Sequence, residues 1–178
     1  MSNVVVRRGS RARGKATKER HALTIEEGMP APGFELPDAE GKPVKLADFK
    51  GRVIVVYFYP KDDTPGCTSE AKDFTCIAAD FEKAGTDVLG ISPDSSASHR
   101  KFREKHGLGV LLLADEARSA AAAYGVWVEK SMYGRKYMGV ERATFLIDRD
   151  GKVARCWRNV RVPGHAEDVL EAARALKG

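Results

Sequence analysis

One cysteine of this chain lies in a sequence setting that favours a reactive thiolate. Cys67 follows Thr64, Pro65 and Gly66, shortly after an apolar run that ends at Tyr59. Threonine is a preferred N-cap residue and proline is preferred at the first helical position, so the pattern predicts that Cys67 lies in a first helical turn. There, free backbone N–H groups and the positive end of the helix dipole stabilise a thiolate, which is the nucleophilic form of cysteine.

Thr64 stands where a Cys-x-x-Cys motif would carry its second thiol. A hydroxyl donates and accepts hydrogen bonds but cannot form a disulfide, so this pair is not suited to simple dithiol exchange and disfavours a thiol–disulfide oxidoreductase. A hydroxyl beside a thiolate suits the holding of a small polar oxygen substrate in line for attack. Taken alone, the motif also fits an N-cap threonine followed by an inert cysteine.

The elements that would position Cys67 follow from the hydrophobic pattern. Residues 53–59 predict a central parallel strand that is buried on both faces, and residues 65–83 predict the helix after it. The order of strands and helices predicts an α/β fold, a three-layer sandwich with a mixed sheet flanked by helices, and the thioredoxin-like arrangement is the obvious member of that class. Further strands are predicted at 87–91, 110–114, 143–147 and 152–157, the last two as a hairpin across an Asp-Gly turn, and further helices at about 95–106, 117–124 and 165–176.

The length and the charge distribution predict one domain with a basic N-terminal arm. The chain has 178 residues and a formal charge of +5, but residues 1–21 alone contain seven basic side chains and one acidic side chain. The remaining residues have a charge balance near zero, so the basicity belongs to the arm. We expect a disordered arm at 1–21 and the folded domain at 22–178. An organelle transit peptide, nuclear targeting and a weak nucleic-acid-binding tail are alternatives for the arm.

Composition and motifs exclude several other classes of protein. The longest apolar run has seven residues, far below the roughly 18 needed to span a bilayer, so no membrane-spanning role is expected. Three irregularly spaced cysteines do not make a secreted disulfide scaffold, which favours a reducing compartment such as the cytoplasm. The four histidines have no metal-ligand spacing, and no phosphate loop or dinucleotide fingerprint occurs. We therefore expect neither a bound metal nor a cofactor.

The segment from Tyr57 to Glu70, YFYPKDDTPGCTSE, resembles the peroxidatic-cysteine motif of the peroxiredoxins, Pro-x-x-x-Thr-x-x-Cys. It resembles in particular the bacterioferritin comigratory protein (PrxQ) group, within the thioredoxin-like superfamily. The resemblance covers about residue 25 to the C-terminus. It continues through Ser92-Pro93-Asp94, Tyr124-Gly125-Val126-Trp127, Glu129-Lys130, Met132-Tyr133-Gly134 and Arg142-x-Thr144-Phe145-Leu146-Ile147-Asp148-x-Asp150-Gly151.

This resemblance implies a peroxidase reaction at Cys67. The thiolate would attack the O–O bond of hydrogen peroxide or an organic hydroperoxide and become a sulfenic acid. Thr64 would form hydrogen bonds with the thiolate and with the incoming peroxide. Arg142 matches the active-site arginine of the family, and its guanidinium fork suits stabilising the thiolate and the charge on the leaving oxygen. Without the family context, Arg142 would read as an exposed arginine of a sheet.

The same resemblance implies three supporting residues. The backbone N–H groups of Gly66 and Cys67 would complete a cradle for the peroxide, and Pro60 would shield the thiol from water. Glu70 resembles the residue that orients the arginine. An acidic residue is also favoured in the first turn of any helix, so a purely local role for Glu70 is equally open.

The chain departs from the family pattern in the second, resolving cysteine. Many PrxQ proteins carry that cysteine five residues after the first, where this chain has Lys72, and another subgroup carries it in the stretch that is Ala120 to Ala123 here. Cys76 lies nine residues after Cys67, which in a helix places it on the opposite face and about 13 Å away along the axis. A disulfide needs Cα atoms within about 7 Å, so the pair could form only if the helix melted.

We therefore expect a one-cysteine mechanism, in which an external thiol resolves the sulfenic acid. Three roles stay open for Cys76: a resolving cysteine, a spectator thiol and an intermolecular partner. Cys156 is expected to be a small sheet residue. The resemblance implies thioredoxin, glutaredoxin or a low-molecular-weight thiol as reductant, and a monomer or weak dimer. A different class is a thioredoxin-fold binding module whose basic arm binds nucleic acid, but the intact Thr64, Cys67 and Arg142 disfavour it.

Overall fold

The structure is a computed structural model and describes residues 24–176. The basic arm predicted at residues 1–21 lies outside the described residues, as does the predicted start of the domain at residue 22. Within residues 24–176, no helix is long and apolar enough to cross a membrane.

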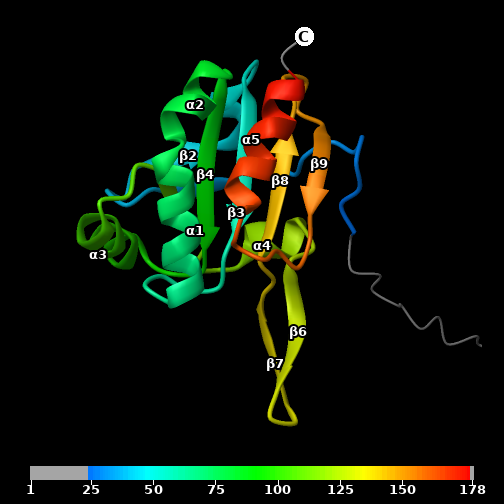
Figure 1. The fold of residues 1–178 in the computed structure, drawn as a ribbon. Helices are drawn as coiled ribbons and strands as arrows, with labels where there is room; N and C mark the ends of the chain where they lie inside the picture. The colour runs from blue at the N-terminus through cyan, green and yellow to red at the C-terminus, as the bar shows by residue number, and fades with distance from the viewer. Residues whose placement is uncertain (1–23, 177–178) are drawn as a thin grey trace, which may run out of the picture.

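A five-stranded mixed sheet forms the middle layer, with the strand order β5-β4-β3-β8-β9 (Figure 1). β3 is central and pairs in parallel with β4, which pairs in parallel with β5; β8 is antiparallel to both β3 and β9. The predicted mixed sheet is thereby confirmed. The strands are β3 (Val53–Phe58), β4 (Thr86–Ser92), β5 (Leu111–Ala114), β8 (Ala143–Ile147) and β9 (Val153–Trp157).

The central strand shows why the sheet has a layer on each face. All six residues of β3 are buried. Val53, Val55 and Tyr57 pack into one core, and the alternate residues Ile54, Val56 and Phe58 pack into the other. A strand covered on both faces needs an apolar side chain at every position, which explains its continuous apolar run.

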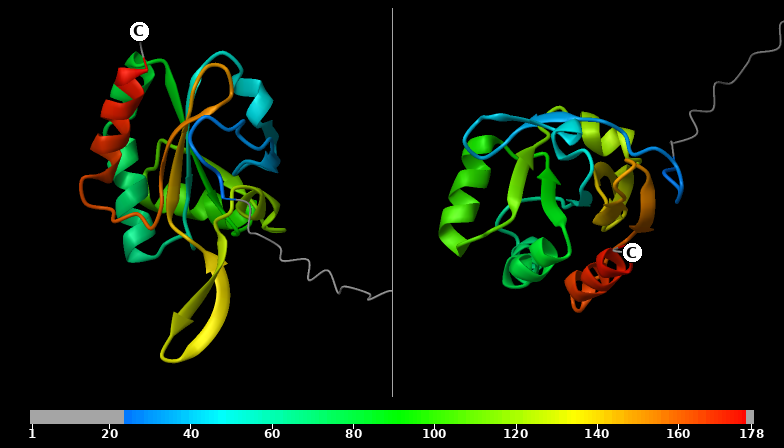
Figure 2. Two further views of the ribbon diagram at one scale, coloured as in Figure 1. Left: turned by 90° about the vertical axis from the view of Figure 1, so that its right-hand side faces the viewer. Right: turned by 90° about the horizontal axis from the view of Figure 1, so that it is seen from above.

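Helices cover both faces of this sheet, and the view from above in Figure 2 shows them on its two sides. The core on one face receives side chains from four helices, and the core on the other face receives them from one helix and the N-terminal strands. This arrangement confirms the predicted three-layer α/β sandwich. The first set is α1 (Pro65–Cys76), α2 (Ala78–Lys83), α3 (Ser96–His106) and α5 (His165–Ala175); the second is α4 (Ser119–Ala123), β1 (Glu35–Pro37), β2 (Pro43–Lys45) and the 3₁₀-helix η1 (Leu46–Phe49).

The sequence predicted a single helix over residues 65–83, and this prediction was wrong in one respect. The observed helix is broken at Ile77 into α1 and α2. The hydroxyl of Thr75 donates to the Ala71 carbonyl at 2.7 Å and accepts from the Gly109 N–H at 3.1 Å. Threonine hydroxyls that bond back to the preceding turn bend helices, and here the hydroxyl also joins the helix end to a neighbouring loop. The break places Cys76 at the last position of α1.

A second hairpin, which the sequence pattern did not predict, joins β6 (Trp127–Met132) to β7 (Arg135–Val140). Its turn residues Tyr133 and Gly134 both have positive φ, at 50° and 76°, as in the two-residue type I′ turn. The ribbon extends away from the body of the molecule (Figures 1 and 2). Among residues 24–176 the large exposed apolar side chains all belong to it: Met132, Tyr133, Tyr137 and Met138.

Candidate active site

Cys67 lies in the first turn of α1, immediately beyond the carboxyl end of the central strand β3. Thr64 is the N-cap residue, with extended φ and ψ of −89° and 155°, and Pro65 is the first helical residue. The first backbone bond of the helix runs from the Thr68 N–H to the Thr64 carbonyl at 2.9 Å. The amides of Gly66 and Cys67 precede this bond and have no partner within the described chain, so both are free to donate to a ligand. The Cys67 side chain is only 2% exposed.

Arg142 reaches the sulfur from the segment between β7 and β8. The antiparallel pairing of β3 and β8 sets Ala143 opposite Phe58, which brings residue 142 to the end of β3 from which the loop to α1 departs. Nη2 of Arg142 donates to Cys67 Sγ at 3.3 Å, and Nη1 donates to the Glu70 carboxylate at 2.9 Å. The guanidinium therefore joins the cysteine to a carboxylate of the same helix, and each of its two terminal nitrogens has a defined partner.

Gly66 allows this close approach. A Cβ atom at residue 66 would lie 3.1 Å from Arg142 Nη2, which is tighter than an ordinary contact. A side chain at residue 66 would therefore require the guanidinium to shift. The sequence pointed to the backbone N–H of Gly66, and the structure adds this second, steric reason for a glycine.

Glu70 is almost completely buried, with 1% of its surface exposed, so it is not a solvated acid of a first helical turn. One carboxylate oxygen pairs with Arg142, whereas the other, Oε2, has no hydrogen-bond partner within the described residues. Burial raises the pKa of Glu70 to about 7, and the attraction of Arg142 only partly opposes this effect. The carboxylate is thus held close to its protonation midpoint at neutral pH.

The hydroxyl of Thr64 does not cap α1. It donates to the Lys61 carbonyl at 2.9 Å, and no hydrogen bond joins it to Cys67 in the described part of the chain. A hydroxyl whose single hydrogen is committed to a carbonyl offers only its lone pairs to other groups. In this arrangement Thr64 can accept a hydrogen bond from a substrate, but it does not donate one to the sulfur.

Pro60 is half-buried and directly follows Tyr59, the last residue of the buried run. With Lys61 it lines a cavity of about 310 Å³, which Trp127, Tyr137 and Met138 of the β6–β7 hairpin also line.

The other two cysteines do not approach Cys67, and all three thiols are free. Cys76 is exposed at the end of α1, whereas Cys156 is half-buried in β9. Burial raises the pKa of the Cys156 thiol, which disfavours its reactive thiolate form. Among residues 24–176, no group of three or more His, Cys, Asp and Glu side chains could hold a metal ion.

Sequence reasoning missed a buried polar cluster beside the site. The Lys- and Arg-rich composition of residues 95–106 indicated a polar helix, yet His99 in α3 is fully buried and pairs with buried Asp62 at 2.7 Å. The spacing of His99, Phe102 and His106 is that of one helix face, and this periodicity was the available signal. Along the chain, Asp62 lies in the loop that connects the central strand β3 to the helix of Cys67.

Together, the fold and these contacts define a class of protein, the thioredoxin-fold proteins in which the cysteine at the N-terminus of the helix after the central strand has a hydroxyl in place of the second thiol. The sulfur lies at a helix N-terminus with an arginine donor on it, which is an arrangement for nucleophilic attack rather than for metal binding.

Comparisons with known proteins agree with this class. Residues 28–156 match the model of the AhpC/TSA family. Peroxiredoxin Bcp of Bacillus subtilis is 47% identical over 86% of this chain and 98% of that relative, and peroxiredoxin Bcp of Xanthomonas campestris is 44% identical over 83% and 93%. The solved structure of Xanthomonas campestris peroxiredoxin Q superposes with a TM-score of 0.77 at 43% identity, covering 80% of this chain and 90% of the other. A cysteine-to-serine mutant of Xylella fastidiosa PrxQ gives 0.81 at 36% identity, with coverage of 85% and 96%.

The chain belongs to the AhpC/TSA family and is a peroxiredoxin of the Bcp (PrxQ) group. It is therefore a thiol peroxidase, an enzyme whose substrate is a peroxide and whose reductant is a thiol.

Proposed function

We propose that Cys67 is the peroxidatic cysteine and that Arg142 activates it. The thiolate sulfur attacks the terminal oxygen of a hydroperoxide, so that an S–O bond forms while the O–O bond breaks. Cys67 becomes a sulfenic acid, and the leaving hydroxide or alkoxide takes a proton from water to give water or an alcohol. The single observation that carries this proposal is the 3.3 Å contact between Arg142 Nη2 and Cys67 Sγ.

Each supporting residue has a role in this step that agrees with its position. The Arg142 guanidinium stabilises the thiolate and the charge that develops on the leaving oxygen, and Glu70 holds the guanidinium in place. The free amides of Gly66 and Cys67 donate to the peroxide oxygens. The Thr64 oxygen accepts the hydrogen of the incoming hydroperoxide, and Pro60 restricts the access of water.

The sulfenic acid is resolved by an external thiol. Cys76 lies nine residues along the same helix, and a disulfide to Cys67 would require α1 to unfold. The incoming thiolate forms a disulfide with the Cys67 sulfur and releases hydroxide, which becomes water on protonation, and a second thiol then releases reduced Cys67. Thioredoxin, glutaredoxin and low-molecular-weight thiols can all supply these electrons.

Both hydrogen peroxide and organic hydroperoxides are proposed as substrates. The Xanthomonas campestris bacterioferritin comigratory protein, which superposes on this chain with a TM-score of 0.78, was studied for alkyl peroxide reduction activity. In the present chain, the cavity lined by Pro60, Trp127 and Met138 offers apolar surface close to the loop that leads to Cys67.

Peroxide consumption by the purified protein tests the proposal, with dithiothreitol and with thioredoxin as alternative reductants. Full loss in Cys67→Ser and full retention in Cys156→Ser are expected. Retained turnover in Cys67→Ser would refute the role of Cys67.

Peptide mapping without reductant, after one equivalent of peroxide, tests the resolution step. We expect a trapped sulfenic acid on Cys67 and no peptide linked to Cys76. A Cys67–Cys76 linked peptide would refute the one-cysteine mechanism while leaving the peroxidase proposal intact.

A further inference from the structure

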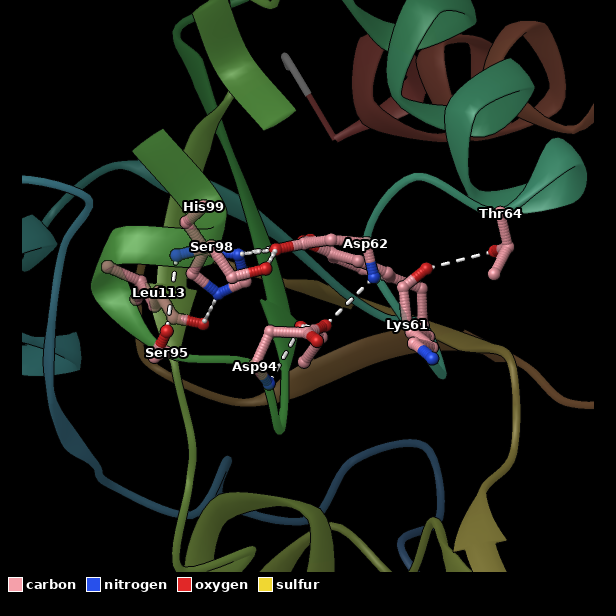
Figure 3. Close-up of polar contacts among 10 residues, drawn as sticks. Lys61, Asp62, Thr64, Asp94, Ser95, Ser98, His99 and Leu113 are labelled. Atoms are coloured by element: carbon pink, nitrogen blue, oxygen red, sulfur yellow. Dashed lines mark hydrogen bonds and ion pairs between the residues drawn. The ribbon is translucent and has the colours of Figure 1, made fainter. Parts of the chain in front are cut away.

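The peptide group between Lys61 and Asp62 is held at both of its edges (Figure 3). Its carbonyl, from Lys61, accepts the Thr64 hydroxyl at 2.9 Å, and its N–H, from Asp62, donates to the Asp94 carboxylate at 2.8 Å. Because a peptide group is planar, a bond that fixes the N–H direction also fixes the carbonyl direction. Asp94 therefore determines where the acceptor of the Thr64 hydrogen lies, although it does not contact Thr64.

The Asp62 side chain anchors the loop between β3 and α1, which contains this peptide group, to α3. This side chain is 4% exposed and receives hydrogen bonds from the hydroxyls of Tyr59 at 2.6 Å and Ser98 at 2.8 Å. His99 Nδ1 lies 2.7 Å from the same carboxylate, and His99 Nε2 lies 2.9 Å from the Leu113 carbonyl of β5 (Figure 3).

The surroundings of His99 define how this buried pair is bonded. A carbonyl only accepts hydrogen bonds, so His99 Nε2 carries the hydrogen that is donated to the Leu113 carbonyl. The imidazole thereby connects the loop to the backbone of β5. Among the hydrogen bonds of residues 24–176, neither residue of this pair bonds to the Cys67 sulfur, whose donor is Arg142.

Asp94 and Asp63 make further contacts around the loop between β3 and α1. Asp94, which follows β4, also accepts the Ser92 hydroxyl at 2.6 Å, so its own position is fixed. Asp63 has a left-handed φ of 59°, and its carboxylate pairs with Lys105 at 2.6 Å and His106 at 2.7 Å in the last turn of α3. Aspartate adopts such a φ more readily than most non-glycine residues, and these two pairs hold Asp63 in it.

We propose that Asp94 and the buried Asp62–His99 pair are positioning residues for Thr64. They hold the Lys61–Asp62 peptide so that the Thr64 hydrogen stays on the Lys61 carbonyl and the Thr64 oxygen remains a hydrogen-bond acceptor for the peroxide. Without this constraint the hydroxyl is free to rotate and to donate to the thiolate, which stabilises the ground state and turns the lone pairs of the oxygen away from the peroxide. The inference rests on the proposed function, because it concerns the role of Thr64 in that reaction.

The test is a double-mutant cycle on the second-order rate constant for oxidation of Cys67 by hydrogen peroxide, measured in a single turnover. Asp94→Ala is expected to lower this constant about three- to tenfold, which corresponds to one hydrogen bond of typical strength. Asp94→Asn keeps a carbonyl acceptor for the Asp62 N–H and is expected to retain most of the rate. In a Thr64→Val background, Asp94→Ala is expected to cause no further loss.

Ser98→Ala provides a second, milder arm, because it removes one hydroxyl donor to Asp62 and leaves the buried pair in place. A loss of about twofold is expected, again only when Thr64 is present. The matched control is Ser119→Ala in α4, on the other face of the sheet. It deletes a similar hydroxyl–carboxylate bond to Asp115, which follows β5, and should leave the rate unchanged.

Two outcomes would overturn the inference. One is an unchanged rate in both Asp94→Ala and Ser98→Ala, and the other is an equal loss from these changes with and without the Thr64 hydroxyl. The latter would mean that the two residues act on the fold in general. Failure of the proposed function has a different signature, because the parent enzyme itself would then show no peroxide-dependent oxidation of Cys67.

Discussion

Replacing Glu70 by glutamine should change how the stability of this enzyme depends on pH. Glu70 is buried beside Arg142, and burial raises its pKa from 4.5 to about 7. Between these two pH values the folded state holds a proton that the unfolded state has released. The free energy of unfolding must therefore fall as the pH rises through this window, and this loss is complete above about pH 7.

The size of the effect follows from the same two values. A tenfold difference in proton affinity corresponds to about 1.4 kcal/mol, so the contribution of Glu70 amounts to about 3 kcal/mol. Glutamine has a similar shape and retains an oxygen acceptor for Arg142, but it does not ionise. The difference in unfolding free energy between Glu70→Gln and the parent enzyme should thus move by about 3 kcal/mol in favour of the variant between about pH 4 and about pH 8.

His165 contributes the opposite slope. Burial lowers the pKa of His165 to about 4, with Asp168 opposing the change and Arg142 adding to it. The folded state then holds fewer protons than the unfolded state from about pH 4 to 6.5, so this group makes stability rise with pH. The two slopes largely cancel in the parent enzyme between pH 4.5 and 6.5. Glu70→Gln should remove one of them and reveal the rise due to His165.

Urea unfolding at a series of pH values measures both effects. The parent curve should be nearly flat in the shared window because of these two groups, and the Glu70→Gln curve should rise. Other titrating groups contribute equally to both proteins and cancel in the difference. Two parallel curves with a constant offset would refute the conclusion that the buried carboxyl takes up a proton on folding.

Three further changes test other contacts. Gly66→Ala places a methyl group 3.1 Å from Arg142 Nη2, so it should displace the guanidinium and slow Cys67 oxidation about tenfold in stopped-flow measurements, with the fold unchanged. Gly90→Ala places its methyl group 2.7 Å from the buried Tyr57 ring, which cannot retreat, and should lower the unfolding free energy by about 1 to 3 kcal/mol in urea titrations. Cys76→Ser should leave dithiothreitol-supported turnover unchanged, and a loss of turnover would show that this thiol takes part in resolution.

The local surroundings of the cysteine could be predicted from the sequence, because the signals that define them are local. A seven-residue apolar run predicted the central strand, and the Thr-Pro-Gly-Cys order predicted a helix that begins at Pro65. The boundaries of the other predicted elements follow from hydrophobic periodicity and turn residues in the same way.

Long-range contacts could not be derived in this manner. Arg142 lies 75 residues after Cys67, and only the family resemblance connected them, because no local pattern encodes the pairing of β3 with β8. His99 was read as part of a polar helix because its neighbours are charged. Its burial depends on Asp62, which precedes it by 37 residues.

The β6–β7 hairpin was missed for a different physical reason. Both faces of this two-stranded ribbon meet solvent, so its strands lack the alternation of apolar and polar residues that identifies a half-buried strand. Its turn signal was the Tyr133-Gly134 step, which is weaker than the Asp-Gly step of the hairpin that was predicted.

The central claim is that Arg142 acts directly on the Cys67 sulfur. Its most direct test is the single-turnover rate of Cys67 oxidation by hydrogen peroxide in Arg142→Gln, with the exposed Arg155→Gln as the matched control. A hydrogen bond to a charged group contributes about 1.5 to 3 kcal/mol, so a loss of about ten- to a hundredfold is predicted for Arg142→Gln and none for the control. Equal rates in the two variants would contradict the account.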